Sequence, residues 1–125
     1  MSDLKSPLAL PFSAGRGGRG VLVLHGFAGT PAHVRPVCEA LAEQGYTVRA
    51  PLLPGHGESL EAMSRFSWRD WLLAAREAYA QLARECEKVA VAGLSMGGLL
   101  ALILAEEYPV DGAITMSAPL YLRKK

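Results

Sequence analysis

A single serine, Ser95, stands at the centre of the sequence Gly-Leu-Ser-Met-Gly. A strand-like apolar run (88–93) precedes it and a helix-like apolar run (95–108) follows it. A sharp strand-to-helix turn leaves no room for side chains two positions either side of its apex, which suits Gly93 and Gly97. Such a turn lifts the hydroxyl clear of the sheet, at a helix N-terminus that stabilises negative charge. The pattern therefore predicts a serine nucleophile that attacks an acyl carbon.

Attack by Ser95 creates an oxyanion that needs preorganised hydrogen-bond donors. The backbone amide of Met96, at the start of the helix-like run, is placed to supply one of them. The second must come from the end of another strand, and His25-Gly26-Phe27 directly follows the apolar run at 20–24. We expect the amide of Phe27 to be the second donor, with His25 and Gly26 shaping the turn that carries it.

The elements that must position these groups alternate along the chain. Strand-like and helix-like segments follow one another at 20–26, 30–44, 46–51, 67–86, 88–93, 95–108 and 112–117. This alternation predicts one α/β domain over residues 1–125, with a mostly parallel sheet and helices on both faces. The carboxyl ends of the strands then lie at one edge of the sheet. That edge should bring together Gly26–Phe27, the loop at 54–59, Ser95 and Ser117–Pro119.

Local patterns add details to this scheme. A short edge strand is expected around Ala9–Ser13, and the glycine-rich segment at 15–20 is expected to be a turn between two strands, because it precedes a strand and does not open a helix. Pro36 suggests that the first helix begins only after it. Trp68 and Trp71 share the apolar face of the helix at 67–86 and are expected in the core.

Five segments resemble successive core segments of the α/β-hydrolases, in particular small bacterial carboxylesterases and monoacylglycerol-lipase-like enzymes. These segments are VLVLHGFAGTP, YTVRAPLLPGHGES, WLLAAREAY, KVAVAGLSMGGLLAL and GAITMSAPLYL, which span roughly residues 20–122. The resemblance implies ester hydrolysis through an acyl-enzyme on Ser95, an oxyanion hole formed by the Phe27 and Met96 amides, and no cofactor or metal. Cleavage of short or medium acyl esters or monoacylglycerols is the expected reaction.

The base that such a serine needs is not evident in these 125 residues. In the family, an Asp or Glu and then a His follow the nucleophile, but His25, His33 and His56 all precede Ser95. We expect His25 to support the backbone, His56 to organise its loop, and His33 to be exposed or to make a minor cap contact. Asp111 is expected to be structural, because it lies before a strand and so at the far end of the sheet from the nucleophile. The chain is accordingly expected to be an N-terminal half that is nearly inactive alone.

Alternatives remain open at this stage. A non-catalytic module could bind an apolar ligand in the same place, and a thioesterase or acyltransferase would use the same residues. Gly-x-Ser-x-Gly also occurs by chance, and serine is a common helix cap. Four apolar residues expected around the nucleophile favour an acyl chain over a charged group: Phe27, Leu94, Met96 and Leu120.

Composition excludes several other classes. A net charge of +1 gives no electrostatic basis for binding nucleic acid or an anionic membrane. No apolar run reaches the length of a membrane span, and a cytoplasmic location is expected. Cys38 and Cys86 are expected to be reduced core thiols. The strand at 112–117 is expected to form an exposed edge, through which the chain could self-associate.

Overall fold

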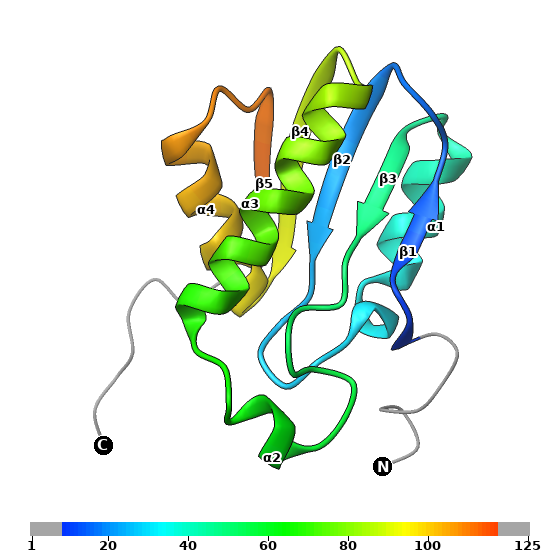
Figure 1. Ribbon diagram of the computed structural model, residues 1–125. Coiled ribbons are helices and arrows are strands. Elements are labelled where there is room, and N and C mark those ends of the chain that lie inside the picture. The colour runs from blue at the N-terminus through cyan, green and yellow to red at the C-terminus, as the bar shows by residue number, and fades with distance from the viewer. Residues whose placement is uncertain (1–8, 118–125) are drawn as a thin grey trace.

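A computed structural model describes residues 9–117 of the chain. Pro119 and Leu120, which the sequence places near Ser95, lie outside these residues. The strands form one sheet in the order β1-β3-β2-β4-β5 (Figure 1), in which β1 is antiparallel to β3 and the other pairs are parallel. The strands are β1 (Phe12–Ala14), β2 (Arg19–Leu24), β3 (Thr47–Ala50), β4 (Lys88–Leu94) and β5 (Gly112–Met116). The predicted α/β class and the short edge strand near the N-terminus are both confirmed.

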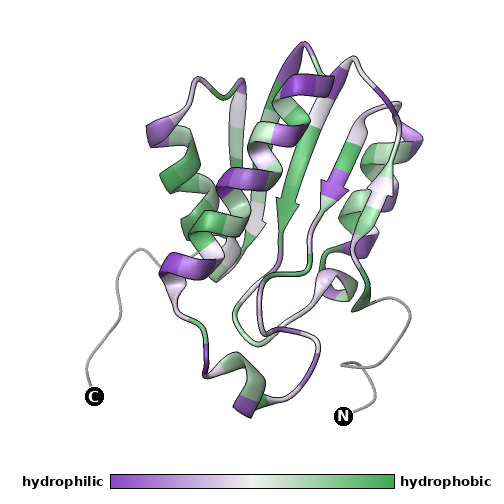
Figure 2. Cartoon of the chain, viewed as in Figure 1, coloured by the Kyte–Doolittle hydropathy of each residue, from purple (hydrophilic) through white to green (hydrophobic). Residues whose placement is uncertain are grey.

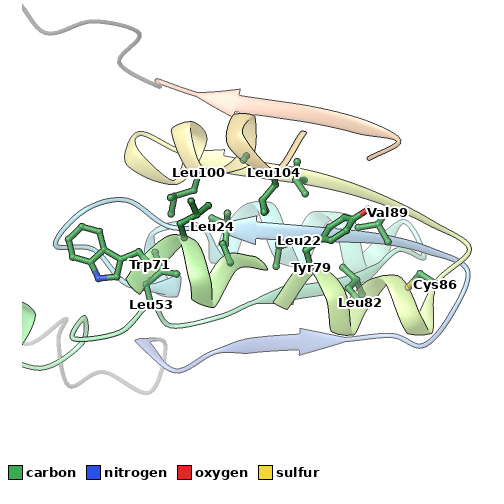
Figure 3. Packing of buried hydrophobic residues seen from close by; sticks show 14 of the residues in the cluster. Leu22, Leu24, Leu53, Trp71, Tyr79, Leu82, Cys86, Val89, Leu100 and Leu104 are labelled. Atoms are coloured by element: carbon green, nitrogen blue, oxygen red, sulfur yellow. The ribbon is translucent and has the colours of Figure 1, made fainter. Parts of the chain in front are cut away.

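Helices cover both faces of the sheet. They are α1 (Arg35–Glu43) on one face, and α3 (Trp68–Glu85) and α4 (Met96–Glu107) on the other, whereas the short α2 (Leu60–Met63) lies beyond the strand ends (Figure 1). Successive side chains of β2 point to opposite faces, so Leu22 and Leu24 pack with α3 and α4, whereas Val21 and Val23 pack with α1. Figure 3 shows the first of these clusters, in which the β2 leucines meet side chains from both helices. A strand buried on both faces explains the unbroken apolar run of β2.

The amphipathic character of α3 differs from the uniform hydrophobicity of α4. In Figure 2, α3 carries hydrophilic bands on turns that face the viewer, while β2 and α4 are mainly hydrophobic.

Ser67 and Asp70 form the predicted capping box, in which the Ser67 amide donates to the Asp70 carboxylate at 2.8 Å. The predicted helix boundaries at this cap are therefore confirmed.

The expectation that both tryptophans of α3 are buried is wrong for Trp68. Trp71 is buried, but Trp68 remains 51% exposed, with the guanidinium of Arg69 over its ring at 4.8 Å. Periodicity gives the direction in which a side chain points, and not whether another element lies there. The first turn of α3 lies near α2, at the end of the molecule beyond the strand ends (Figure 1), so Trp68 has little to pack against.

Two further boundaries differ from expectation. Helix α1 starts at Arg35, before Pro36, because the second helical position does not need the amide hydrogen that proline lacks. The chain enters α1 through a short 3₁₀ helix, Pro31–His33, which is capped by Thr30. The short helix α2, which follows the expected loop at 54–59, was not predicted.

Strand β5 lies at the outer edge of the sheet among residues 9–117, as predicted. Its side chains are largely exposed, and Ile114 is 54% exposed. Within the same residues, no helix is both long and apolar enough to cross a bilayer.

We expect the isolated 125-residue chain to self-associate through β5, because an unpaired strand edge with an exposed isoleucine is a template for another strand. Sedimentation velocity should show dimers or larger species, and Ile114→Lys should shift them towards monomer. Leu73→Lys on α3 is the matched control, since Leu73 is also 54% exposed. A wild-type chain that sediments only as a monomer would contradict this expectation.

Candidate active site

Ser95 occupies the junction between β4 and α4 in a backbone conformation that L-residues rarely adopt. Its φ is 55° and its ψ is −117°, and its side chain makes no capping hydrogen bond. The ordinary caps of this chain behave differently: Thr30, Ser59 and Ser67 are extended and accept a backbone hydrogen bond. Capping therefore does not account for Ser95. Such strain costs about 1–3 kcal/mol and is typical of functional positions.

The glycines on either side of Ser95 are required by close backbone packing. A Cβ at Gly93 would overlap the carbonyl group of Gly97. A Cβ at Gly97 would overlap the Leu24 carbonyl and would lie 2.5 Å from the carbonyl oxygen of His25. The first turn of α4 is thus pressed against the end of β2, which explains the small residue at position 97.

The turn after β2 lies against Ser95. A Cβ on Gly26 would be 3.4 Å from the Cβ of Ser95 and 3.3 Å from the carbonyl oxygen of Leu94. The Gly29 amide donates to the Gly26 carbonyl at 3.0 Å, which closes the turn around Phe27. Neighbouring parallel strands therefore bring together the two backbone segments that the sequence analysis selected.

The amides of Phe27 and Met96 are the two expected oxyanion donors. Within residues 9–117, neither amide donates to a protein acceptor. The Ser95 amide, by contrast, donates to the Met116 carbonyl at 2.7 Å and is committed to the end of β5. Two unpaired donors thus remain in the turns that flank the serine.

His25 connects the turn after β2 to the loop after β3. It is fully buried, its Nε2 accepts from the Leu53 amide at 3.1 Å, and its Nδ1 lies 2.9 Å from the Gly26 carbonyl oxygen. Because Nε2 accepts from an amide, the single proton of the neutral ring belongs on Nδ1. Burial, above all, lowers the pKa of His25 to about 4, so the ring is neutral at physiological pH. This is the backbone-supporting role that the sequence predicts.

We expect His25 to make stability depend on pH below neutrality. Its pKa is near 6.5 in the unfolded chain and about 4 when folded, so the unfolded state binds more protons between these values. The free energy of unfolding should therefore fall as pH drops from 6.5 to 4, by up to about 3 kcal/mol. Urea unfolding across this range measures the effect.

The control is His25→Gln, which removes the titrating group. Its amide oxygen retains the ability to accept from Leu53. The variant should be less stable at pH 7 but should lose less stability on acidification than the wild type. Parallel pH profiles for the two proteins would contradict this assignment.

His56 is also buried and structurally engaged. Its Nδ1 lies 3.1 Å from the Pro54 carbonyl oxygen, and its ring packs between those of His25 and Trp71, at 4.9 and 5.2 Å between centroids. Desolvation by burial is the main cause that lowers its pKa. In the part of the chain that the structure describes, none of His25, His33 and His56 hydrogen bonds to Ser95.

Asp111 supports the far end of the sheet. Its carboxylate accepts from the Val89 amide at 2.7 Å, and its own amide donates to the Val89 carbonyl at 2.8 Å. Val89 is at the start of β4, whereas Ser95 follows the end of that strand. Asp111 therefore lies too far along the sheet to reach Ser95, as expected.

Sequence reasoning missed a cavity of about 260 Å³ next to these turns. Its wall comes from Ala28 in the turn after β2, from Thr30 and His33 of the capped 3₁₀ helix, and from the segment Gly55–Met63 that contains α2. The Gly-Pro-rich composition of the segment at 55–63 predicts a loop, but it does not predict how close that loop lies to the turn after β2.

Among residues 9–117, no group of three or more His, Cys, Asp or Glu side chains could hold a metal ion.

Comparison with known proteins finds relatives that are named as a lipase and an esterase. The chain is 47% identical over 111 residues to a thermostable monoacylglycerol lipase of Bacillus sp. (strain H-257), covering 88% of this chain and 44% of that protein. It is 37% identical over 116 residues to a carboxylesterase of Bacillus subtilis (strain 168), covering 92% of this chain and 47% of that protein. The chain thus spans about half the length of these curated relatives.

Structural comparison agrees. A structure described under "LipS and LipT, two metagenome-derived lipolytic enzymes" superimposes with a TM-score of 0.90 at 35% identity, over 94% of this chain and 49% of that one. The family profile described as "alpha/beta hydrolase fold" matches residues 20–123. With the parallel sheet and the serine turn described above, this match shows that the chain belongs to the α/β-hydrolase fold family.

Proposed function

We propose that the protein containing this chain hydrolyses carboxylic esters through an acyl-enzyme on Ser95. The observation that carries the proposal is the strained backbone of Ser95, held against the turn of Gly26 and Phe27, with two amides nearby that donate to no acceptor within residues 9–117. The relatives named as a monoacylglycerol lipase and a carboxylesterase support the same reaction class. Short or medium acyl esters and monoacylglycerols are the proposed substrates.

In the proposed first step, the Ser95 oxygen bonds to the acyl carbon while a base removes the hydroxyl proton. The carbonyl electron pair moves onto oxygen, and the Phe27 and Met96 amides donate to this oxyanion. Loss of one such donor typically costs about 2.7–4 kcal/mol of transition-state stabilisation. Collapse of the intermediate breaks the bond to the alcohol, which takes up the proton, and water then cleaves the acyl-serine by the same sequence.

The base and its carboxylate partner lie, in this proposal, outside these 125 residues. Backbone groups engage both ring nitrogens of His25, and within residues 9–117 neither His25 nor His56 hydrogen bonds to Ser95. Asp111 is committed to Val89 at the opposite end of the sheet. The curated relatives are about twice as long as this chain and have room for both groups.

We therefore expect the 125-residue chain alone to be nearly inactive. Without a base, only the oxyanion donors and substrate contacts contribute, and turnover should fall by several orders of magnitude relative to the full-length protein. Hydrolysis of p-nitrophenyl butyrate by equal concentrations of the two proteins measures the difference. Equal rates would require a base within residues 1–125.

The surroundings of Ser95 favour an apolar acyl group. Phe27 is 58% exposed beside the serine turn, and Leu94 and Met96 are partly exposed on either side of it. These side chains would cover an alkyl chain but offer no charge to a charged one. Thioester hydrolysis and acyl transfer to an alcohol would use the same residues.

A trapping experiment tests the acyl-enzyme. The full-length protein is given p-nitrophenyl and phenyl esters of one acid, together with hydroxylamine. A shared acyl-serine should give the same ratio of hydroxamate to free acid from both esters, because the leaving group has already departed. Ratios that follow the leaving group would exclude the intermediate, and no turnover of any ester would reject the proposed function.

A further inference from the structure

Trp71, in the first turn of α3, lies against the turn that carries the Phe27 amide. The centroids of the indole and phenyl rings are 5.6 Å apart, and the planes of the two rings are inclined at 65°. This edge-to-face arrangement is one that aromatic pairs favour. The His56 ring is farther from the phenyl ring, at 6.2 Å between centroids. Because α3 packs on one face of the sheet, Trp71 supports this turn from outside the sheet.

The indole is itself fixed in place. Its Nε1 donates to the Pro54 carbonyl at 2.9 Å, and its ring packs on that of His56 at 5.2 Å between centroids. Trp71 belongs to the buried cluster shown in Figure 3, and it is only 6% exposed. Burial, ring packing and the hydrogen bond together restrict its orientation. The indole is therefore placed to hold a neighbouring side chain rather than to contact a substrate.

The turn between Gly26 and Gly29 needs such a support. Ala28 has a φ of 61°, in the left-handed region that is unfavourable for residues other than glycine. The hydrogen bond from the Gly29 amide to the Gly26 carbonyl closes the turn, but within residues 9–117 neither Phe27 nor Ala28 makes a backbone hydrogen bond. The middle of the turn is therefore strained, and the contact of the Phe27 ring with the indole restrains it.

We propose that Trp71 is a positioning residue for the reaction at Ser95, which acts through the Phe27 ring to aim the Phe27 amide at the oxyanion. This inference rests on the proposed ester hydrolysis. The ring and the amide nitrogen of Phe27 are joined through one Cα, so a shift of the ring also moves the amide. Oxyanion donors work only when they are aimed at the place where charge develops. A bound ester gains little from this donor before the reaction, so the effect should fall on kcat rather than on KM.

A double-mutant cycle on the full-length protein tests this inference. Trp71→Leu removes the indole, whereas Phe27→Leu removes the ring that the indole contacts but keeps an apolar side chain and the amide. Loss of an oxyanion donor costs about 10²–10³ in kcat, so a misplaced donor should cost less, and each variant should lose roughly tenfold in kcat with p-nitrophenyl butyrate. KM should stay within about a factor of two. Because both substitutions break the same contact, the double variant should lose little more than the larger single loss.

Tyr79→Leu is the matched control for the loss of a buried ring from α3. Tyr79 is 7% exposed and belongs to the same cluster, where its ring stacks on that of Tyr108 at 4.7 Å between centroids. At a temperature where the variant is folded, its kcat should stay within about a factor of two of the wild type, although its stability falls. Trp71→Phe, which returns a ring to the contact, should recover part of the kcat that Trp71→Leu loses.

Losses of kcat that multiply in the double variant would overturn the proposal. A loss in Trp71→Leu that Tyr79→Leu matches, or that appears only in KM, would also overturn it, as would no recovery in Trp71→Phe. If Trp71→Leu does not fold, the exposed position Phe27 decides: an unchanged kcat in Phe27→Leu overturns the proposal, and a loss confined to kcat supports it. A wild type without ester turnover would reject the proposed function and this inference together, whereas an active wild type with unaffected variants would reject this inference alone.

Discussion

Ser95→Ala should abolish ester turnover by the full-length protein, with a fall in kcat of ~10⁶-fold. The substitution removes the hydroxyl that forms the acyl bond and leaves only the oxyanion donors and substrate contacts. Because alanine at this position adds no atoms, the turn should persist, and the unfolding curve should change little. The steady-state rate with p-nitrophenyl butyrate measures the loss.

Ser13→Ala is the matched control for the loss of a serine hydroxyl. Ser13 is exposed on the edge strand β1, which is separated from β4 by β3 and β2. Its removal should leave kcat within a factor of two of the wild type. An Ser95→Ala protein that retains more than a small fraction of the wild-type rate would show that another residue forms the acyl-enzyme.

Gly97→Ala should produce a large loss of stability. A methyl group there would overlap the Leu24 carbonyl and crowd that of His25, so β2 and α4 must separate. We expect the free energy of unfolding to fall by ~3 kcal/mol or more. Urea unfolding of the full-length protein at neutral pH gives this quantity.

Gly112→Ala provides the comparison for Gly97→Ala. Gly112 does not have a positive φ, and a Cβ there would meet only the Cβ of Ala90, at an ordinary 3.9 Å. This variant should change the free energy of unfolding by less than about 0.5 kcal/mol. If both variants unfold alike, the close approach of α4 to the end of β2 is not a constraint on the fold.

The features that sequence reasoning predicted are those set by local pattern. The order of strands and helices follows from hydrophobic periodicity, and the turn at Ser95 follows from the spacing of Gly93 and Gly97. The capping box of Ser67 and Asp70 is likewise a local motif. Each of these depends on residues close together in the chain.

The features that were missed depend on where one loop lies relative to another. Trp68 has the same helical direction as buried residues of α3 but extends beyond the sheet, so it is exposed. The cavity wall arises only when the turn after β2 meets the segment around α2. Hydrophobic periodicity within either segment does not predict this contact. The Trp71 indole, on α3, also donates to the Pro54 carbonyl and so fixes the loop from a helix that is distant in the sequence.

The most direct test of the central claim is to identify the residue that a fluorophosphonate modifies. The full-length protein is incubated with the probe and digested, and the labelled peptide is sequenced by mass spectrometry. We predict a single adduct on Ser95, with labelling that is lost in Ser95→Ala and kept in Ser13→Ala. An adduct on a different residue would contradict the assignment of Ser95 as the nucleophile. Labelling that persists in Ser95→Ala would contradict it as well.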